Sequence, residues 1–183
     1  MIDLVYINWI VKIGWWGINS SSINENIVKL DFCTERYVLK FNTYNLPLPQ
    51  RDFTASPLEA IKICEEDSSR FPIVILYKEE VAGFFVLHGW EGVGVYSNNQ
   101  DAILIRAFSI DSVFQGKGIA QSAMQLVDSF VKEHFPEKNE IILAVNHENI
   151  IAQHVYKKCG FEDKGIRVVG RKGEQFVYHK SIN

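Results

Sequence analysis

The stretch "IRAFSIDSVFQGKGIAQSAMQLVDSF", residues 105–130, decides the fold of this chain. Its first residues belong to an apolar run, residues 102–110, that predicts a buried strand. A short turn with two glycines follows, and the residues after it repeat at helical spacing and predict a helix over residues 118–133. The apolar positions of that helix are Ile119, Ala123, Leu126, Val127 and Phe130. A glycine-bearing turn between a strand and a helix is typical of sites that hold phosphorylated compounds.

Three phosphate-binding devices compete for this turn. A Walker loop ends in Gly-Lys-Ser/Thr, but here Lys117 lies between Gly116 and Gly118. A dinucleotide fingerprint requires Gly or Ala at position 121, which is Gln, and an acidic residue at the end of the next strand, where Glu140 stands at its start. The third device is a run of bare backbone N–H groups that opens a helix and binds anions. The turn alone leaves this device and a plain strand–helix connection open.

Two sequence motifs decide between these alternatives. Gln115, Gly118 and Ala120 fit the pattern [RQ]-x-x-G-x-[GA], and the turn resembles the acetyl-CoA pyrophosphate turn of the GNAT superfamily of N-acetyltransferases. The stretch "LAVNHENIIAQHVYKKCGF" resembles that superfamily's second motif, L-x-V-x-x-x-N-x-x-A-x-x-x-Y-x-x-x-G-F, at every fixed position: Leu143, Val145, Asn149, Ala152, Tyr156, Gly160 and Phe161. The chain is therefore identified as a member, with the specific match over residues 102–161 and a looser one over residues 26–180.

The order of predicted elements suits that superfamily. Strands are expected at 26–32, 71–77, 81–88, 102–110 and 140–146, with a last hairpin in 166–180, and helices at 33–42, 56–67, 118–133 and 149–160. Crossover helices predict parallel pairing and hairpins predict antiparallel pairing, so the sheet is expected to be mixed. The resemblance implies the α/β (α+β) GNAT fold. This is a mostly antiparallel twisted sheet of about six to seven strands with about four helices and a central gap for the pantetheine arm.

The resemblance also implies how the co-substrate acetyl-CoA is held. The end of the strand 102–110 pairs with the pantetheine amide groups. The turn after it and the first residues of the next helix, 115–121, bind the pyrophosphate. The predicted binding residues are Phe108, Ser109, Ile110, Gln115, Gly116, Lys117, Gly118, Ile119, Ala120 and Gln121. Asn149, Ala152 and Tyr156 share one helix face beside the pantetheine. Tyr156 is the expected general acid that protonates the departing CoA thiolate.

The general base is left open by the sequence. An alkylammonium with a pKa near ~10.4 must lose a proton before it attacks, so a base or a desolvating pocket is needed. The family commonly places an acidic residue in its fourth strand, where this chain has Arg106 and Ala107. The candidates are then Glu91, Asp101 and His88.

The acceptor is expected to be a small-molecule primary amine, attacked directly in a ternary complex. "RAFSIDSVFQGKG" is similar to strings in some polyamine acetyltransferases of the superfamily, but it does not fix the substrate. The loops 43–55 and 88–101 are expected to form the acceptor wall, with Tyr44, Phe53, Trp90 and Tyr96 as aromatic residues. Two alternatives stay open: a protein N-terminal or lysine acetyltransferase, and a non-catalytic acyl-CoA-binding module.

Composition narrows the setting. The 183-residue chain has a formal net charge of −3, which gives no electrostatic reason to bind nucleic acid. Three widely spaced cysteines suit a reducing cytoplasm and predict neither a disulfide framework nor a metal site. Residues 1–22 are apolar but too interrupted for a membrane span and lack the features of a signal peptide. They are expected to be an extension of uncertain role before a single domain, 23–183, and their tryptophans leave a homodimer contact open.

Overall fold

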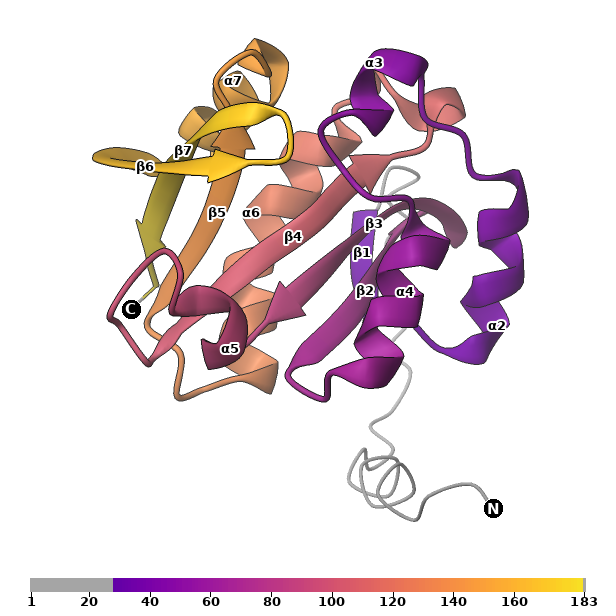
Figure 1. The fold of residues 1–183 in the computed structure, drawn as a ribbon. Helices are drawn as coiled ribbons and strands as arrows, with labels where there is room; N and C mark the ends of the chain where they lie inside the picture. Colours follow the sequence, from indigo (N-terminus) through magenta and orange to yellow (C-terminus); the bar gives the residue numbers. More distant parts are fainter. Residues whose placement is uncertain (1–27, 183) are drawn as a thin grey trace.

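Residues 28–182 form one seven-stranded sheet in the order β1-β2-β3-β4-β5-β7-β6 (Figure 1). The computed structural model describes residues 28–182, so the expected extension, residues 1–22, lies outside the described residues. The strands are β1 (Val28–Phe32), β2 (Arg70–Tyr77), β3 (Glu80–His88), β4 (Ala102–Ile110), β5 (Glu140–Asn146), β6 (Glu162–Gly170) and β7 (Gly173–Ser181). Only β4 and β5 pair in parallel among these strands, which confirms the mixed, mostly antiparallel sheet.

All four expected helical regions are helical, and two further single turns appear. The α-helices are α2 (Glu35–Val38), α3 (Leu48–Arg51), α4 (Pro57–Glu66), α5 (Trp90–Val93), α6 (Ile119–His134) and α7 (Ile150–Lys158), with 3-10 turns at Leu39–Thr43 and Ser112–Phe114. The extra turns, α3 and α5, have four residues each and lie in segments expected to be loops. Within the described part of the chain, no helix combines the length and the apolar character that a membrane span requires.

The helices cover both faces of the sheet. On one face α6 packs against the strands through Ile119, Ala123, Val127 and Phe130 as expected, while Leu126 is only half-buried and Met124 and Val131 complete the buried stripe. On the other face Phe41 and α4's Ala60 pack against Val74, Leu76, Phe84 and Val86. The sheet is thus the middle layer of three (Figure 1).

The sheet separates between β4 and β5. The two strands pair only over Ala102–Ile105 and Glu140–Leu143. Beyond Ile105, β4 pairs only with β3, and it carries a bulge at Ala107, whose φ of 52° lies in the left-handed region. Figure 1 shows the two strands side by side at one end and apart at the other. This is the central gap that the family resemblance implied.

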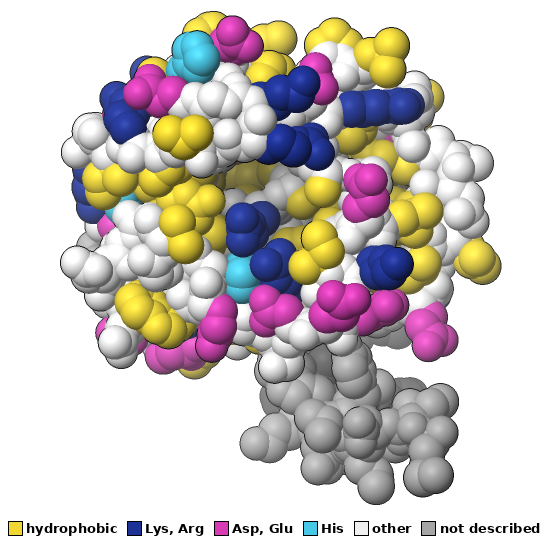
Figure 2. Space-filling model, in the orientation of Figure 1, with side chains coloured by type: hydrophobic (Ala, Val, Ile, Leu, Met, Phe, Trp, Pro, Cys, Tyr) yellow, Lys and Arg dark blue, Asp and Glu magenta, His cyan; other side chains and the backbone are white. Residues whose placement is uncertain are grey.

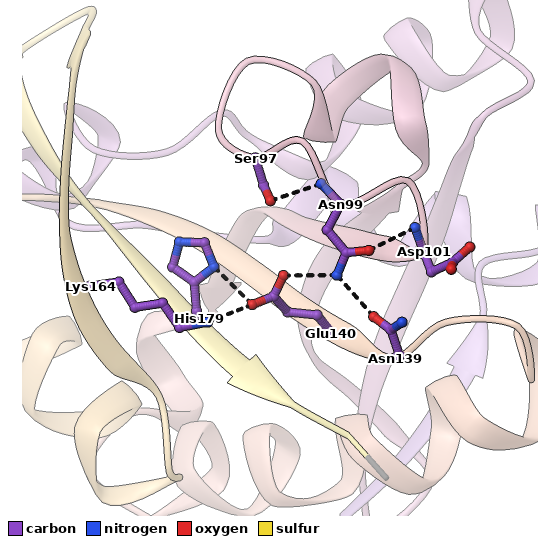
Figure 3. A network of polar contacts seen from close by, with 7 residues as sticks. All are labelled: Ser97, Asn99, Asp101, Asn139, Glu140, Lys164 and His179. Atoms are coloured by element: carbon purple, nitrogen blue, oxygen red, sulfur yellow. Dashed lines mark hydrogen bonds and ion pairs between the residues drawn. The ribbon is translucent and has the colours of Figure 1, made fainter.

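A buried carboxylate stabilises the closed end of this strand pair, which is the end where β4 and β5 are hydrogen-bonded. Glu140, the first residue of β5, accepts hydrogen bonds from Lys164 Nζ (2.9 Å) and Asn99 Nδ2 (3.1 Å), and His179 Nδ1 lies 3.0 Å from the same carboxylate (Figure 3). Asn99 also donates to Asn139 and accepts from the backbone N–H of Asp101. The Glu140 network therefore ties β5 to the turn before β4 and to β6 and β7.

Replacing Glu140 by Gln is expected to lower the free energy of unfolding by about 1–2 kcal/mol at pH 7, because Gln keeps the shape but loses the charge-assisted bonds. The partly exposed Lys164 limits the loss. Burial alone would raise the pKa of Glu140, but the hydrogen bonds of the network outweigh burial and lower this pKa below its ordinary value. The advantage of the wild type is therefore complete above the unfolded pKa of about 4.3 and disappears as the pH falls through the lower folded pKa.

Urea denaturation of both proteins between pH 3 and pH 7 measures this difference. Glu137→Gln is the matched control, since Glu137 is exposed and lies 4.0 Å from its only ion-pair partner in the described residues, Lys138. That control is expected to change stability by less than about 0.5 kcal/mol. Equal stability of Glu140→Gln and the wild type at pH 7 would contradict a stabilising role for the network.

Candidate functional site

A cavity of about 670 Å³ opens where β4 and β5 separate. Its walls come from the ends of these strands, the turn before α6, the start of α7 and the segment around α3. Twelve of the thirteen predicted cofactor residues line it: Phe108, Ser109, Ile110, Gln115, Gly116, Gly118, Ile119, Ala120, Gln121, Asn149, Ala152 and Tyr156. Lys117 does not, and its Nζ lies 5.1 Å from the centre of the Phe114 ring. Elements distant in sequence therefore meet at one cavity.

The N-terminus of α6 is left without a side-chain cap. Gly118 is its N-cap residue with a φ of 75°, no side chain within residues 28–182 caps the helix, and the first turn has no acidic residue. By contrast, α4 is closed by a capping box in which Ser56 accepts from the Glu59 N–H and Glu59 accepts from Ser56. The first amides of a 16-residue helix thus face the cavity with the helix dipole behind them, an arrangement that binds anions.

The side chain of Gln115 holds the turn in place. Its Nε2 donates to the Ile110 carbonyl (2.8 Å) and to Gln50 Oε1 (2.8 Å), and Gln50 Nε2 donates back to Gln115 Oε1 (3.1 Å). The turn is therefore tied both to the end of β4 and to α3. Gln50 was missed by the sequence reasoning, because a pairing over 65 residues leaves no local signal.

Asn149 and Gln153 set the position of α7. Asn149 Oδ1 accepts from the Ala152 N–H (3.2 Å) and so caps the helix, and Asn149 is one of the cavity-lining residues. Gln153 is buried and donates to the carbonyls of Asn146 (3.1 Å) and His147 (2.9 Å). These bonds join the start of α7 to the end of β5, beside the gap.

Tyr156 lies against the apolar wall of the cavity. Its ring makes edge contacts with Phe108 (6.3 Å between centroids) and Phe161 (6.0 Å). The side chain is only 8% exposed, and this burial raises the pKa of its phenol well above the ordinary value near 10. The hydroxyl therefore stays protonated at neutral pH and is a donor, not an acceptor, of a proton.

Arg106 reaches the cavity from the face of the sheet opposite α6. Its Nη1 lies 3.3 Å from His88 Nδ1, and His88 Nε2 lies 3.2 Å from Asp67 Oδ2, although poorly aligned for a hydrogen bond. Burial, together with Arg70 and Arg106, lowers the pKa of His88, so the imidazole is neutral at pH 7. His88 is buried, with only 2% of its surface exposed, although it is the last residue of β3. Figure 2 shows this face hollowed, with basic side chains and a histidine at the hollow.

The three candidate bases all lie outside the cavity lining. Glu91 is exposed on α5, Asp101 is exposed in the turn before β4, and His88 lies behind Arg106. Among the described lining residues the one carboxylate is Glu148, which the sequence reasoning missed although it directly precedes Asn149 of the motif. A base role for Glu91, Asp101 or His88 stays a prediction.

The two expected acceptor loops behave differently. The segment 43–55 lines the cavity through Pro47, Pro49, Gln50, Phe53 and Thr54, as expected for an acceptor wall. No residue of 88–101 is among the lining residues. Tyr44 instead bonds Ser109 (2.9 Å between oxygens), and Tyr96 packs under α5 against an apolar cluster.

Two contacts join the segment around α3 to the β6–β7 turn beside the cavity, and together they are called the bridge. Arg171 Nη2 donates to the Arg51 carbonyl (3.2 Å), and Lys172 Nζ forms a 3.0 Å ion pair with Asp52. A second cavity of about 160 Å³ lies along the bridge and shares Phe53, Thr54 and Asn146 with the first. The bridge and the second cavity therefore border the first cavity on the side of α3.

The chain is similar to known proteins in sequence and in fold. The family model described as "Acetyltransferase (GNAT) family" matches residues 37–161. The chain is 40% identical over 153 residues, 83% of its length, to the uncharacterized N-acetyltransferase YbbJ of Bacillus subtilis, and covers 96% of that protein. It is 26% identical to the spermine/spermidine N(1)-acetyltransferase of B. subtilis over 60% of this chain and 74% of that one.

A solved structure shows the same fold. The aminoglycoside acetyltransferase AAC(6')-Ib in complex with coenzyme A and kanamycin superposes with a TM-score of 0.70 at 18% sequence identity. The match covers 85% of this chain and 95% of that one.

Proposed function

The chain belongs to the GNAT family of acetyltransferases, and we propose that it moves the acetyl group of acetyl-CoA to the primary amine of a small molecule. The single observation that carries this is the cavity at the β4–β5 gap. One end of that cavity is a helix N-terminus without a side-chain cap, and one wall holds a buried tyrosine. We propose that the protein acts in the cytoplasm and uses the acetyl-CoA present there.

The fit to acetyl-CoA rests on the chemistry of each wall. The amides at 116–121 suit the doubly charged pyrophosphate, and the glycines at 116 and 118 leave open space where a Cβ would stand. The unpaired edges of β4 beyond Ile105 and of β5 beyond Leu143 offer backbone groups to the amides of a pantetheine arm. Phe108, Ala152 and Tyr156 give that arm an apolar wall.

In the proposed reaction the amine nitrogen forms a bond to the thioester carbonyl carbon, the carbon–sulfur bond breaks, and the thiolate leaves as a thiol. Tyr156 supplies the proton to the sulfur, since burial keeps its hydroxyl protonated. The attacking amine gives up its proton to a base, for which His88, Glu91 and Asp101 are the candidates from sequence. None of the three lines the cavity, so each would act through water.

A small acceptor is supported by the bridge over the cavity. The Arg171 and Lys172 contacts to α3 restrict the face from which an acceptor would reach the gap. An extended protein segment needs an open groove there, so a protein terminus or lysine is the less favoured acceptor. The B. subtilis relative named for spermine and spermidine and the structural neighbour bound to kanamycin are both enzymes of small amines.

The proposal is tested by mixing the protein with acetyl-CoA and a panel of primary amines while free thiol is followed. We expect thiol release above the rate without acceptor for at least one small amine, with an acetylated product of matching mass. Acetyl-CoA binding without turnover on any small amine or peptide would favour the non-catalytic module. Turnover restricted to peptides would favour a protein acceptor.

A further inference from the structure

We propose that the acceptor amine also carries a carboxylate, and that Arg106 binds this carboxylate. The inference rests on the proposed function, because it names the class of acceptor for the same site. It depends on where Arg106 lies, on which of its donors are engaged and on the absence of a negative partner for it among the described residues.

Arg106 borders the cavity at the point where the gap opens. It is the first residue of β4 beyond the last pair with β5, and its backbone pairs with Val86 of β3. Two residues earlier, Leu104 packs with Val93 on the face away from α6, while Ile105 packs on the α6 face. Side chains alternate along a strand, so Arg106 shares the Leu104 face, as its contact with His88 requires.

His88 orients the guanidinium without neutralising it. A neutral imidazole accepts from Arg106 Nη1 through Nδ1. The ring is flanked by Asp67, whose Oδ2 lies 3.2 Å from Nε2, and by Gly92 of α5, at which any Cβ would collide with the ring. His88 and Asp67 are therefore positioning residues for Arg106.

The charge of Arg106 has no carboxylate partner in residues 28–182. The nearest acid in this chain of contacts, Asp67, is separated from it by the imidazole and accepts instead from Ser69 Oγ (2.6 Å) and Arg70 Nε (2.8 Å). Glu148, the one carboxylate of the described cavity lining, is exposed, and its Oε1 lies 3.9 Å from His147 Nε2. A half-buried guanidinium is thus left with free donors that border the cavity.

A carboxylate satisfies these donors better than any neutral group. The planar guanidinium offers parallel N–H groups that match two carboxylate oxygens, and such charge-assisted bonds are stronger than neutral ones. A second ammonium group at this place would be repelled by a nearby positive charge in a partly desolvated cavity. The geometry therefore favours an amino acid over a diamine or polyamine of similar length.

Matched acceptors test the inference on the wild-type protein. Each member of a set of small amino acids is compared with its own carboxamide, and putrescine and spermidine are added. We expect kcat/KM for the acid to exceed that for its carboxamide and for both polyamines by at least about 10-fold, the value of one charge-assisted hydrogen bond. The inference would be overturned by a carboxamide whose kcat/KM equals or exceeds that of its acid, or by a polyamine whose kcat/KM equals or exceeds that of the amino acids. Either result would leave the acetyltransferase proposal intact.

Two variants assign the preference to Arg106. In Arg106→Gln the kcat/KM values for acid and carboxamide are expected to lie within about 3-fold of each other. Arg106→Lys is expected to keep part of the preference for the acid, because it keeps the charge but loses the parallel N–H groups of the guanidinium. Acetyl-CoA affinity, measured by calorimetry, is expected to be unchanged in both. An undiminished acid preference in folded Arg106→Gln would refute the assignment to Arg106. Thiol release on none of the amines by the wild type would instead count against the proposed function itself, and the inference would fall with it.

Discussion

Replacing Gly118 by valine is expected to raise the dissociation constant for acetyl-CoA by more than about 100-fold. Gly118 has a φ of 75°, where a β-branched residue is strained by about 1–2 kcal/mol, and its Cβ would project into open space at the cavity. That space is where the proposed pyrophosphate approaches the backbone, so the substitution would both tilt the bare amides and block the approach. Calorimetric titration with acetyl-CoA measures the effect.

Gly165→Val is the matched control for this change. Gly165 lies in β6 with a φ of 83°, has nothing within 4 Å of its Cβ position and is not a lining residue. Both variants should lose similar stability from backbone strain, and only Gly118→Val should lose acetyl-CoA affinity. Equal affinities in the two variants would show that the turn does not hold the co-substrate.

Replacing Tyr156 by phenylalanine is expected to lower kcat by about 100-fold and to leave acetyl-CoA affinity within about 2-fold, since only the proton donor is removed. The ring contacts to Phe108 and Phe161 are kept. Because burial raises the pKa of Tyr156, its hydroxyl stays protonated up to at least its ordinary value near 10. The wild-type rate should therefore show no alkaline loss from this group between pH 7 and pH 9.

Tyr178→Phe provides the control for loss of a buried hydroxyl. Tyr178 is fully buried in β7, its hydroxyl has no hydrogen-bond partner in the described residues, and it does not line the cavity. Its removal is expected to leave kcat unchanged. A steady-state rate for Tyr156→Phe equal to that of the wild type would remove Tyr156 from the reaction, and a parallel fall in both variants would point to a general packing defect.

The sequence predicted the part of the fold whose signals are local. The strand, turn and helix around Gly118 and the strand and helix around Asn149 carry regular hydrophobic spacing and motif residues close together in the chain. The structure brings both to one cavity, lined by all the predicted cofactor residues except Lys117. Their roles in binding remain predictions, but their placement agrees with the family resemblance.

The parts that the sequence did not predict depend on distant contacts. The single helical turn α3 is too short for a periodic signal and is tied down by Gln50 to Gln115. The burial of His88 is a second example, because this last residue of β3 is buried and Gly92 of α5 lies against its ring. Such burial arises from tertiary packing, which neither composition nor spacing encodes.

The separation of β4 and β5 has a consequence for hydrogen exchange. Paired strand amides exchange only when the sheet opens, whereas amides that face the gap have no neighbouring strand and exchange through small local motions. The closed end, held by Glu140, should therefore exchange slowly, and the gap-facing amides of residues 106–110 should exchange fast in the free protein. Added acetyl-CoA should slow exchange of the amides in residues 106–110 far more than exchange at the closed end, because the pantetheine arm would pair with them as a neighbouring strand does.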